Sequence, residues 1–315
     1  MKTELTSKLI SRFDRLSGRR ENWETHWQEV ADYMLPRKAD ITKKRSRGDK
    51  RMERIFDSSP LQALELLSSS LHGMLTNPST PWFTLRFKQM NQLDDDEAKL
   101  WLEEATDVMY KAFNRSNFQQ EIFELYHDLI TFGTAAMFIE EDDEDLIKFS
   151  TRHIDEVYIA ENSKGKIDTI FRKFNMTARA LVQKFGDNVS QDVAAMAKKN
   201  PFEEISIIHA VYPRNDFNPK KKDKKNMPFE SVYFEYKGGN ELSVSGFKEF
   251  PFVVPRYLKA SQEVYGRSPA MTALPDVKML NEMCKTTIKA AQKQVDPPLL
   301  VPDDGFLLPV RTVPG

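Results

Sequence analysis

The sequence has almost no cysteine and no long apolar run. Cys284 is the only cysteine among 315 residues, so no internal disulfide can form, and a reducing compartment is expected. No stretch approaches the ~18 uncharged apolar residues of a membrane span. The N-terminal segment is charged throughout and lacks the apolar core of a signal peptide. These absences predict a protein that is cytoplasmic or made in a cytoplasm, with no membrane partner.

The sequence also lacks an excess of charge of either sign. Its 46 lysines and arginines nearly balance 47 acidic residues. This balance argues against a protein that simply coats nucleic acid, which would be strongly basic, but it leaves room for transient or channel-like contact with DNA. The composition, 40% hydrophobic and 30% charged, indicates a real core with a large solvated surface.

Signals of catalysis are missing or weak. The 12 glycines form neither GxGxxG nor a P-loop, and no GxSxG elbow is present. The five histidines are scattered, without a second ligand at metal spacing. Acidic clusters at 94–97 and 140–145 could bind a divalent metal, but they fit a helix start and a hairpin tip better. We therefore predict no enzyme, no cofactor and no metal, and an inert core thiol at Cys284.

Hydrophobic periodicity predicts an α+β fold. Strand patterns fill 135–175 and 204–254, and a short strand is expected near the end of 76–87. The predicted helices are 3–34, one that starts at Pro60 within 56–75, 94–114, 117–132, 176–201 with a break at Gly186, and 267–294, in which Pro275 introduces a kink or marks the true first turn. This order predicts a small β module that is carried on a helical hairpin and projects from a larger α+β body.

Three basic features could contact nucleic acid or an acidic partner. The stretch 38–54 holds eight basic residues against three acids and reads as a loop or an ordered arm. A loop at 215–228, expected to be disordered unless a partner orders it, contains five lysines. These are Lys220, Lys221, Lys222, Lys224 and Lys225. A stripe about 100° from the apolar seam of the last helix contains Lys278, Lys285, Lys289 and Lys293. A merely solvated surface remains the alternative for each.

Other residues suggest self-assembly. Trp23 and Trp27, four apart on one helix, predict a face that is docked within the subunit or against a neighbour. Leu280 and Ile288, on the seam of the last helix, are further candidates for a subunit interface. Pattern alone therefore indicates an α+β protein with a projecting β module that associates with itself.

Three stretches resemble the head-to-tail connector, or portal, proteins of short-tailed bacteriophages. "IFDSSPLQALELLSSSLHGMLTNPSTPWFTLRF" is similar to the family's opening signature, a D-[ST]-x-P helix start followed by an L-T-x-P…W-F-x-L turn. "IIHAVYPR" resembles the strand that enters the family's projecting module. "YGRSPAMTALPDVKMLNEM…AAQKQVDPPLLVPDDG" resembles its stem helix and exit. Arg20, Trp23, Trp27 and Glu29 approximate a pattern in its first helix.

The resemblance implies a virion protein that forms a twelve-fold ring at one capsid vertex. Double-stranded DNA would pass through the ring during packaging and ejection, without sequence-specific contact. The implied partners are the terminase large subunit, a tail adaptor, capsid and scaffolding proteins, with assembly in the host cytoplasm. The implied regions are a wing (1–175), a first stem helix (176–201), a clip (202–258), a second stem helix (259–295), and a strand that returns to the wing at the start of a tunnel region (296–315).

In this interpretation the lysine stripe lines the channel, or pairs with acids on the neighbouring subunit. The lysine loop of the clip would face the terminase or adaptor. The family continues past residue 315 with a tunnel loop, a long helix and a crown, so we expect a fragment, a split product or part of a longer protein. Two alternatives remain open, which are a metal-dependent nuclease or phosphoesterase that uses the acidic clusters and a monomeric adaptor that binds DNA or protein.

Overall fold

The computed structural model describes residues 3–46, 48–87, 96–218, 223, 226–295 and 297. It has the α+β composition predicted from the sequence. The main helices are α1 (Glu4–Met34), α2 (Ser59–Leu75), α3 (Asp96–Arg115), α4 (Phe118–Phe132), α5 (Ala178–Phe185), α6 (Gln191–Lys199) and α7 (Pro269–Val295). Short 3-10 turns cover Pro36–Lys38, Ile154–Glu156 and Gly186–Asn188. The strands are β1 (Ala136–Asp142), β2 (Leu146–Arg152), β3 (Val157–Glu161), β4 (Ile167–Thr177), β5 (Glu204–Pro213), β6 (Phe229–Glu235), β7 (Glu241–Phe247) and β8 (Phe252–Val253).

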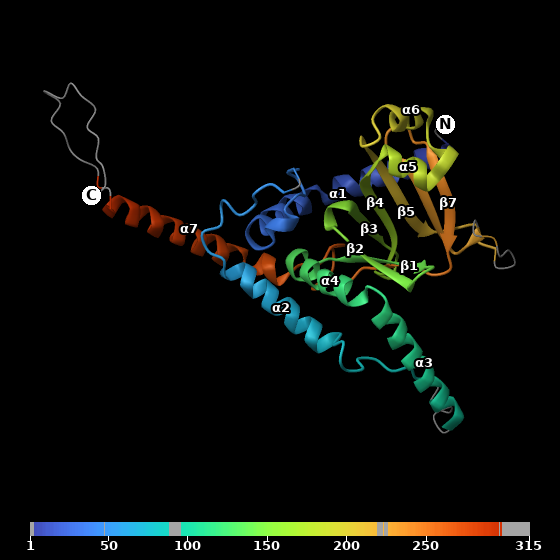
Figure 1. The fold of residues 1–315 in the computed structure, drawn as a ribbon, viewed down its shortest axis with the longest axis horizontal. Coiled ribbons are helices and arrows are strands. Elements are labelled where there is room, and N and C mark those ends of the chain that lie inside the picture. The colour runs from blue at the N-terminus through green and yellow to red at the C-terminus, as the bar shows by residue number, and fades with distance from the viewer. Residues whose placement is uncertain are drawn as a thin grey trace.

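The strands form two antiparallel sheets. One has the order β2-β1-β8 and the other the order β3-β4-β5-β6-β7. Figure 1 shows the sheets gathered at one end of the molecule, while α2, α3 and α7 extend away from them. None of the described helices is long and apolar enough to cross a membrane.

The five-stranded sheet is covered on both faces because its strands are apolar on both sides. Alternation along β5 sends Ile208 to one face and Ile207 to the other. The first face packs against the N-terminal half of α1, where the ring of Phe13 meets that of Tyr158 at 4.6 Å. The second face is shared between α5–α6 and the core that includes the three-stranded sheet.

Local sequence signals set most helix ends. Thr3 and Thr6 form a capping box at the start of α1, which satisfies two free N–H groups. Pro60 lies in the first turn of α2, where a missing N–H costs nothing. Gly133 ends α4 with φ 75°, a conformation that suits glycine. The predicted helix boundaries agree with the structure within a few residues at these elements.

The structure differs from the prediction over 176–201, which is not a single stem helix. The break expected at Gly186 separates two short helices, α5 and α6. Leu181 and Val193 pack against Ile207 and Leu242, so both helices lie on the sheet. They form the connection between β4 and β5, which pair directly as antiparallel neighbours. Apolar contact with the sheet therefore outweighs continuation as one helix.

The predicted boundary of a separate β module at 202–258 is corrected for the same reason. Strands β5, β6 and β7 continue the sheet begun by β3 and β4, and β8 pairs with β1. The strand blocks on either side of α5–α6 therefore form one body. The predicted strand that follows 296 lies mostly outside the described residues.

The short strand expected at 82–87 is absent from that described segment. Its backbone is satisfied by side chains of α3 instead of a neighbouring strand. The Tyr110 hydroxyl accepts hydrogen bonds from the backbone N–H groups of Trp82 and Phe83, each at 2.6 Å, and the Thr106 hydroxyl accepts one from Leu85 at 3.2 Å. Side chains thus replace the ladder that a strand would need.

Candidate assembly and DNA-contact surfaces

Among the described residues, the contacts that fix helix α7 to the body lie in its first half. The Ser268 hydroxyl donates to the Thr131 carbonyl at 2.8 Å and accepts from the Met271 N–H at 3.0 Å, which caps the helix. Met271 and Leu274 are buried. The helix begins at Pro269 and passes through Pro275, so Pro275 does not mark its first turn.

Asn281 is the last buried residue of α7. Its Oδ1 accepts hydrogen bonds from the N–H groups of Phe56 at 2.7 Å and Asp57 at 3.3 Å, and its Nδ2 donates to the Arg54 carbonyl at 3.0 Å. This side chain ties α7 to the segment that precedes α2. Sequence reasoning missed this role, although a polar residue on an otherwise apolar seam was the available signal.

Beyond Asn281, α7 projects from the body (Figure 1). No residue from 282 to 295 is buried. Leu280 and Ile288, two of the predicted interface residues, are 40% and 45% exposed. Cys284 is half-buried between them. The seam of the projecting half therefore faces solvent in the single chain.

The lysine stripe divides into two residues with an ion-pair partner and two for which the described residues include none. Lys278 contacts the Glu29 carboxylate at 2.5 Å, which raises the pKa of Lys278, and Lys285 pairs with Glu282 at 2.9 Å. Lys289 and Lys293 are exposed, and the described residues include no ion-pair partner for either. Lys278 and Lys285 therefore find acidic partners within the chain, where the sequence had suggested acids on a neighbouring subunit.

The two tryptophans lie at different depths. Trp27 is fully buried, its indole N–H donates to the Phe132 carbonyl at 3.1 Å, and its ring packs edge-on against Tyr265 at 5.0 Å. Trp27 is therefore a core residue, which corrects its assignment to a subunit interface. Trp23 is half-buried against the same cluster, so part of its surface is exposed, and its interface role stays a prediction.

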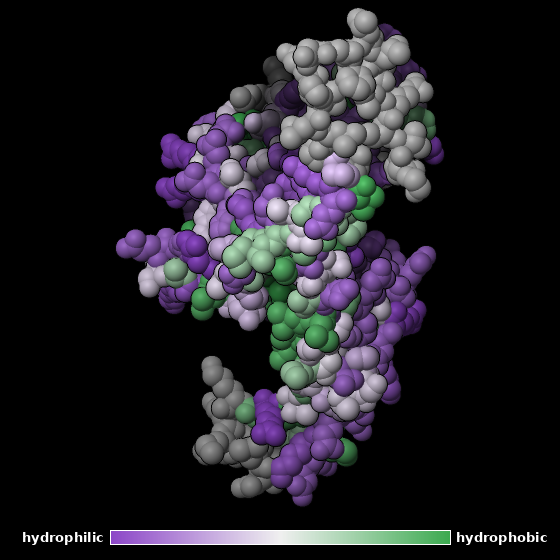
Figure 2. Space-filling view, turned by 90° about the vertical axis from the view of Figure 1, so that its left-hand side faces the viewer, coloured by the Kyte–Doolittle hydropathy of each residue, from purple (hydrophilic) through white to green (hydrophobic). Residues whose placement is uncertain are grey.

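Large apolar side chains are also exposed on the other projecting helices. Figure 2, viewed towards the side from which α7 projects, shows a band of hydrophobic surface down this face. Trp101 on α3 is 62% exposed and Met74 on α2 is 82% exposed. Other exposed members are Leu66, Leu67, Leu75, Leu100, Val108 and Met109. Apolar surface of this extent marks sites of association.

The basic stretch 38–54 is an ordered arm whose cations are largely neutralised. The Gln28 carboxamide oxygen accepts hydrogen bonds from the N–H groups of Ile41, Thr42 and Lys43 at 2.9–3.2 Å. Lys38 contacts the buried Asp128 at 2.5 Å, and Arg45 contacts Asp32 at 3.3 Å. Pairing inside the chain makes this arm less available to DNA than its composition suggests.

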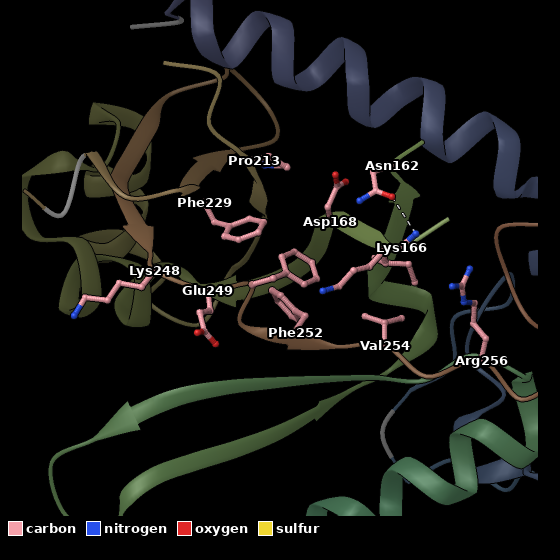
Figure 3. A pocket seen from close by; sticks show the side chains of 12 residues that line it. Asn162, Lys166, Asp168, Pro213, Phe229, Lys248, Glu249, Phe252, Val254 and Arg256 are labelled. Atoms are coloured by element: carbon pink, nitrogen blue, oxygen red, sulfur yellow. Dashed lines mark hydrogen bonds between the residues drawn. The ribbon is translucent and has the colours of Figure 1, made fainter. Parts of the chain in front are cut away.

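A cavity of about 740 Å³ opens where β5 ends and β6 begins (Figure 3). Phe229, Phe250 and Phe252 line it, together with Lys166 and Lys248. The predicted clip lysines Lys220, Lys221, Lys222, Lys224 and Lys225 belong to the connection between these two strands but lie outside the described residues.

Residues 6–315 match the family described as bacteriophage head to tail connecting protein. The chain belongs to this family. It is 35% identical over 314 residues to the portal protein of Salmonella phage epsilon15 and 34% identical over 314 residues to a probable portal protein of Bordetella phage BPP-1. Each alignment covers 98% of this chain and 56% of the relative, so the chain spans a little more than half the length of these curated relatives.

Two residues of the first-helix pattern of this connector family have structural roles here. Arg20 and Trp27 are fully buried. The Arg20 guanidinium lies 3.6 Å from the centre of the Tyr158 ring and donates to the carbonyls of Ile154, Asp155 and Val157. The pattern therefore docks α1 onto the segment that leads into β3.

The described part of the acidic clusters stabilises local structure and does not form a metal site. At the β1–β2 hairpin tip, the Asp142 carboxylate accepts hydrogen bonds from the N–H groups of Glu144 and Asp145 at 3.2 and 3.0 Å, which closes the turn. The residues that the structure describes contain no group of three ligands arranged for a metal ion. Of the other cluster, residues 94 and 95 lie outside the described residues, and Asp96 and Glu97 begin α3.

The described residues bring no group of histidines together as metal ligands. His72 contacts Gln119, His127 contacts Glu65, and His153 contacts the Lys38 carbonyl. His209 is fully buried in β5, stacks on Tyr233 with ring centres 3.9 Å apart, and contacts the Ser231 hydroxyl at 2.9 Å. Burial, followed by the charges of Arg172, Lys184 and Arg152, lowers the pKa of His209 well below its usual value.

Acid is therefore expected to destabilise the fold through His209. The unfolded chain binds a proton near pH 6.5, whereas the folded chain does so only at a much lower pH. Stability contributed by the neutral ring is present above pH 6.5 and falls as the pH drops below it, by up to about 1.4 kcal/mol per pH unit. Urea unfolding of wild type and His209→Gln between pH 7 and 5 measures this, and the variant should show the shallower slope. Ser231→Ala, which retains the histidine, should keep the wild-type slope. Equal slopes for all three proteins would contradict the conclusion that His209 causes the pH dependence of stability.

Proposed function

We propose that this chain is a portal subunit, a structural part of the ring that connects a phage head to its tail and conducts DNA. The observation that carries the proposal is the projecting half of α7, whose exposed apolar seam has no partner among the described residues. The family membership supports the same role. As the resemblance to connector proteins implies, the ring would be twelve-fold, would be part of the virion and would assemble in the host cytoplasm.

Assembly would bury the apolar surfaces of neighbouring subunits against each other. A ring requires a heterologous interface, in which one patch of a subunit meets a different patch of the next. The exposed seam of α7 and the apolar band on α2 and α3 supply two such patches. Burial of one leucine or isoleucine contributes about 1.5–3 kcal/mol, so a few pairs per interface suffice.

The exposed lysines suggest how the ring meets DNA. Lys289 and Lys293 lie four residues apart, on one side of the projecting helix, so each would form a ring of positive charge if α7 lines the channel. Few phosphate contacts per subunit suit a conduit, because every contact adds salt-dependent affinity that would resist sliding. As the resemblance implies, the lysine loop between β5 and β6 would face the terminase large subunit and later the tail adaptor, with capsid and scaffolding proteins as further partners.

The double substitution Leu280→Glu with Ile288→Glu is expected to abolish ring assembly. It removes two apolar side chains per interface and adds charge, which should weaken each subunit contact by about 3 kcal/mol or more, over a hundredfold in affinity. Light scattering coupled to gel filtration, with negative-stain imaging, measures assembly. Unchanged circular dichroism would show that the fold persists.

Lys289→Gln with Lys293→Gln is the matched control on the same half of the helix. These rings should assemble normally, and their DNA binding should depend less on salt. A wild-type chain that stays monomeric at high concentration, as a monomeric adaptor would, contradicts the ring. Assembly that survives the glutamate variant contradicts the proposed interface.

A further inference from the structure

A row of polar residues crosses the second face of the five-stranded sheet. Arg172, His209 and Tyr233 occupy paired positions on β4, β5 and β6, so their side chains lie side by side on one face. On one side of this row lies the apolar contact with α5 and α6, which includes Phe174 and Ile207. On the other side lies the core that includes Phe138 of β1. The polar row, called the cation seam below, therefore separates the two apolar clusters that pack on this face of the sheet.

Two further cations lie near this cation seam, on the elements that pack against the sheet. From α5, the Lys184 ammonium lies 5.0 Å from the centre of the Tyr233 ring. From β2, the Arg152 guanidinium lies 5.9 Å from the centre of the Phe138 ring. The Arg152 Nε is buried and has no hydrogen-bond acceptor among the described residues. A buried donor on a charged group without an acceptor is unusual and calls for an unseen partner.

The carboxylates near the seam do not balance these cations. Glu156 is engaged by the Arg172 Nε at 2.7 Å. Glu140 is the carboxylate left to face Arg152 and Lys184, and the described residues contain no ion pair between it and either cation. Arg152, Arg172 and Lys184 set against Glu140 and Glu156 leave an excess of about one positive charge, and Lys148 also acts on Lys184. Because Arg152 is half-buried, this excess costs free energy unless an anion compensates it.

The titration behaviour agrees with this geometry. Burial first, and then the charge of Arg172, lowers the pKa of Arg152. Burial likewise lowers the pKa of Lys184, against the opposing effect of Glu140. Burial also raises the pKa of Tyr233 to about 12, which keeps its hydroxyl protonated and able to donate.

We propose that this seam binds one phosphate group, held by Arg152, Lys184 and the Tyr233 hydroxyl. All three groups are donors, so they suit a ligand that offers only acceptors. The planar fork of arginine matches the oxygens of phosphate, and a phosphodiester carries the single negative charge that the site lacks. The phosphate is either free inorganic phosphate or part of a nucleic-acid backbone. The site is formed within one chain and does not depend on the proposed ring.

Calorimetric titration of the chain with inorganic phosphate, at constant ionic strength, tests the site. One saturable site per chain is expected, and Arg152→Gln should weaken it about tenfold or more, as expected for loss of a hydrogen bond between charged groups. Lys184→Gln, at a more exposed position, should weaken it similarly and guards against misfolding of the first variant. Arg115→Gln, an exposed arginine on α3, is the control and should bind as wild type.

The two sources give different results in a second arm with a short single-stranded oligonucleotide. If the source is nucleic acid, the oligonucleotide binds, competes with phosphate and fails to bind Lys184→Gln. If the source is free phosphate, no competition is seen; either result supports the proposal. Absence of saturable phosphate binding, equal binding by both seam variants and wild type, or equal binding of acetate would overturn it.

Discussion

Replacement of Gly133 by alanine is expected to destabilise the protein by about 2–5 kcal/mol. The residue has φ 75°, which costs a side chain free energy, and an added Cβ would lie 2.3 Å from the Gly266 carbonyl oxygen. The backbone cannot easily move apart at either residue, because both are held by hydrogen bonds. The Gly133 carbonyl accepts from the Tyr257 N–H at 2.9 Å, and the Gly266 N–H donates to the Thr134 hydroxyl at 2.8 Å. Urea unfolding followed by circular dichroism measures the loss.

Gly18→Ala is the matched control for this prediction. Gly18 lies inside α1 with no atom within 4 Å of an added Cβ, so alanine should stabilise the chain by about 0.5–1 kcal/mol. Changes of similar sign and size at the two glycines would show that neither the positive φ nor the close approach of Gly266 restricts the residue at 133.

Replacement of Arg20 by methionine is expected to cost about 3–5 kcal/mol, because it removes a buried charged donor that binds three backbone carbonyls and one carboxylate. The guanidinium donates to three carbonyls at 2.6–2.9 Å and pairs with Glu24 at 2.7 Å, and its side chain has no exposed surface. Methionine would fill much of the space but would leave these acceptors without donors. Thermal and urea unfolding would both report the change.

Arg19→Met separates this effect from the mere loss of a positive charge on α1. Arg19 is the adjacent residue and is exposed, so its replacement should change stability by no more than about 0.5 kcal/mol. A loss at Arg20 no larger than that at Arg19 would mean that the three carbonyl contacts contribute little to the free energy of unfolding.

The sequence was most informative where structure depends on nearby residues. The end of α4 at Gly133, the start of α2 at Pro60 and the break at Gly186 were all visible, because capping and φ preferences act over a few positions. The sequence around these residues does not show which distant residues they contact. That Gly133 must also admit Gly266 depends on a contact across more than a hundred residues, which no periodicity encodes.

The candidate surfaces show a similar division. The apolar seam of α7 was predicted, and the exposure of Leu280 and Ile288, on either side of Cys284, is consistent with an interface role for both. For Trp23 and Trp27 the pattern could not decide between core and interface, since both environments favour aromatic residues. The cation seam at Arg152, Arg172 and Lys184 was not visible, because its members lie on three separate elements.

By itself, the sequence determined the α+β class, most helix limits and the resemblance to connector proteins, since these follow from short-range patterns and whole motifs. The tertiary structure alone decided that strands on both sides of α5–α6 share one sheet, that Trp27 and Arg20 belong to the core, and that half of α7 projects. The physical reason is that periodicity identifies an apolar face without identifying what covers it. That choice depends on strand register and buried hydrogen bonds between segments far apart in the chain.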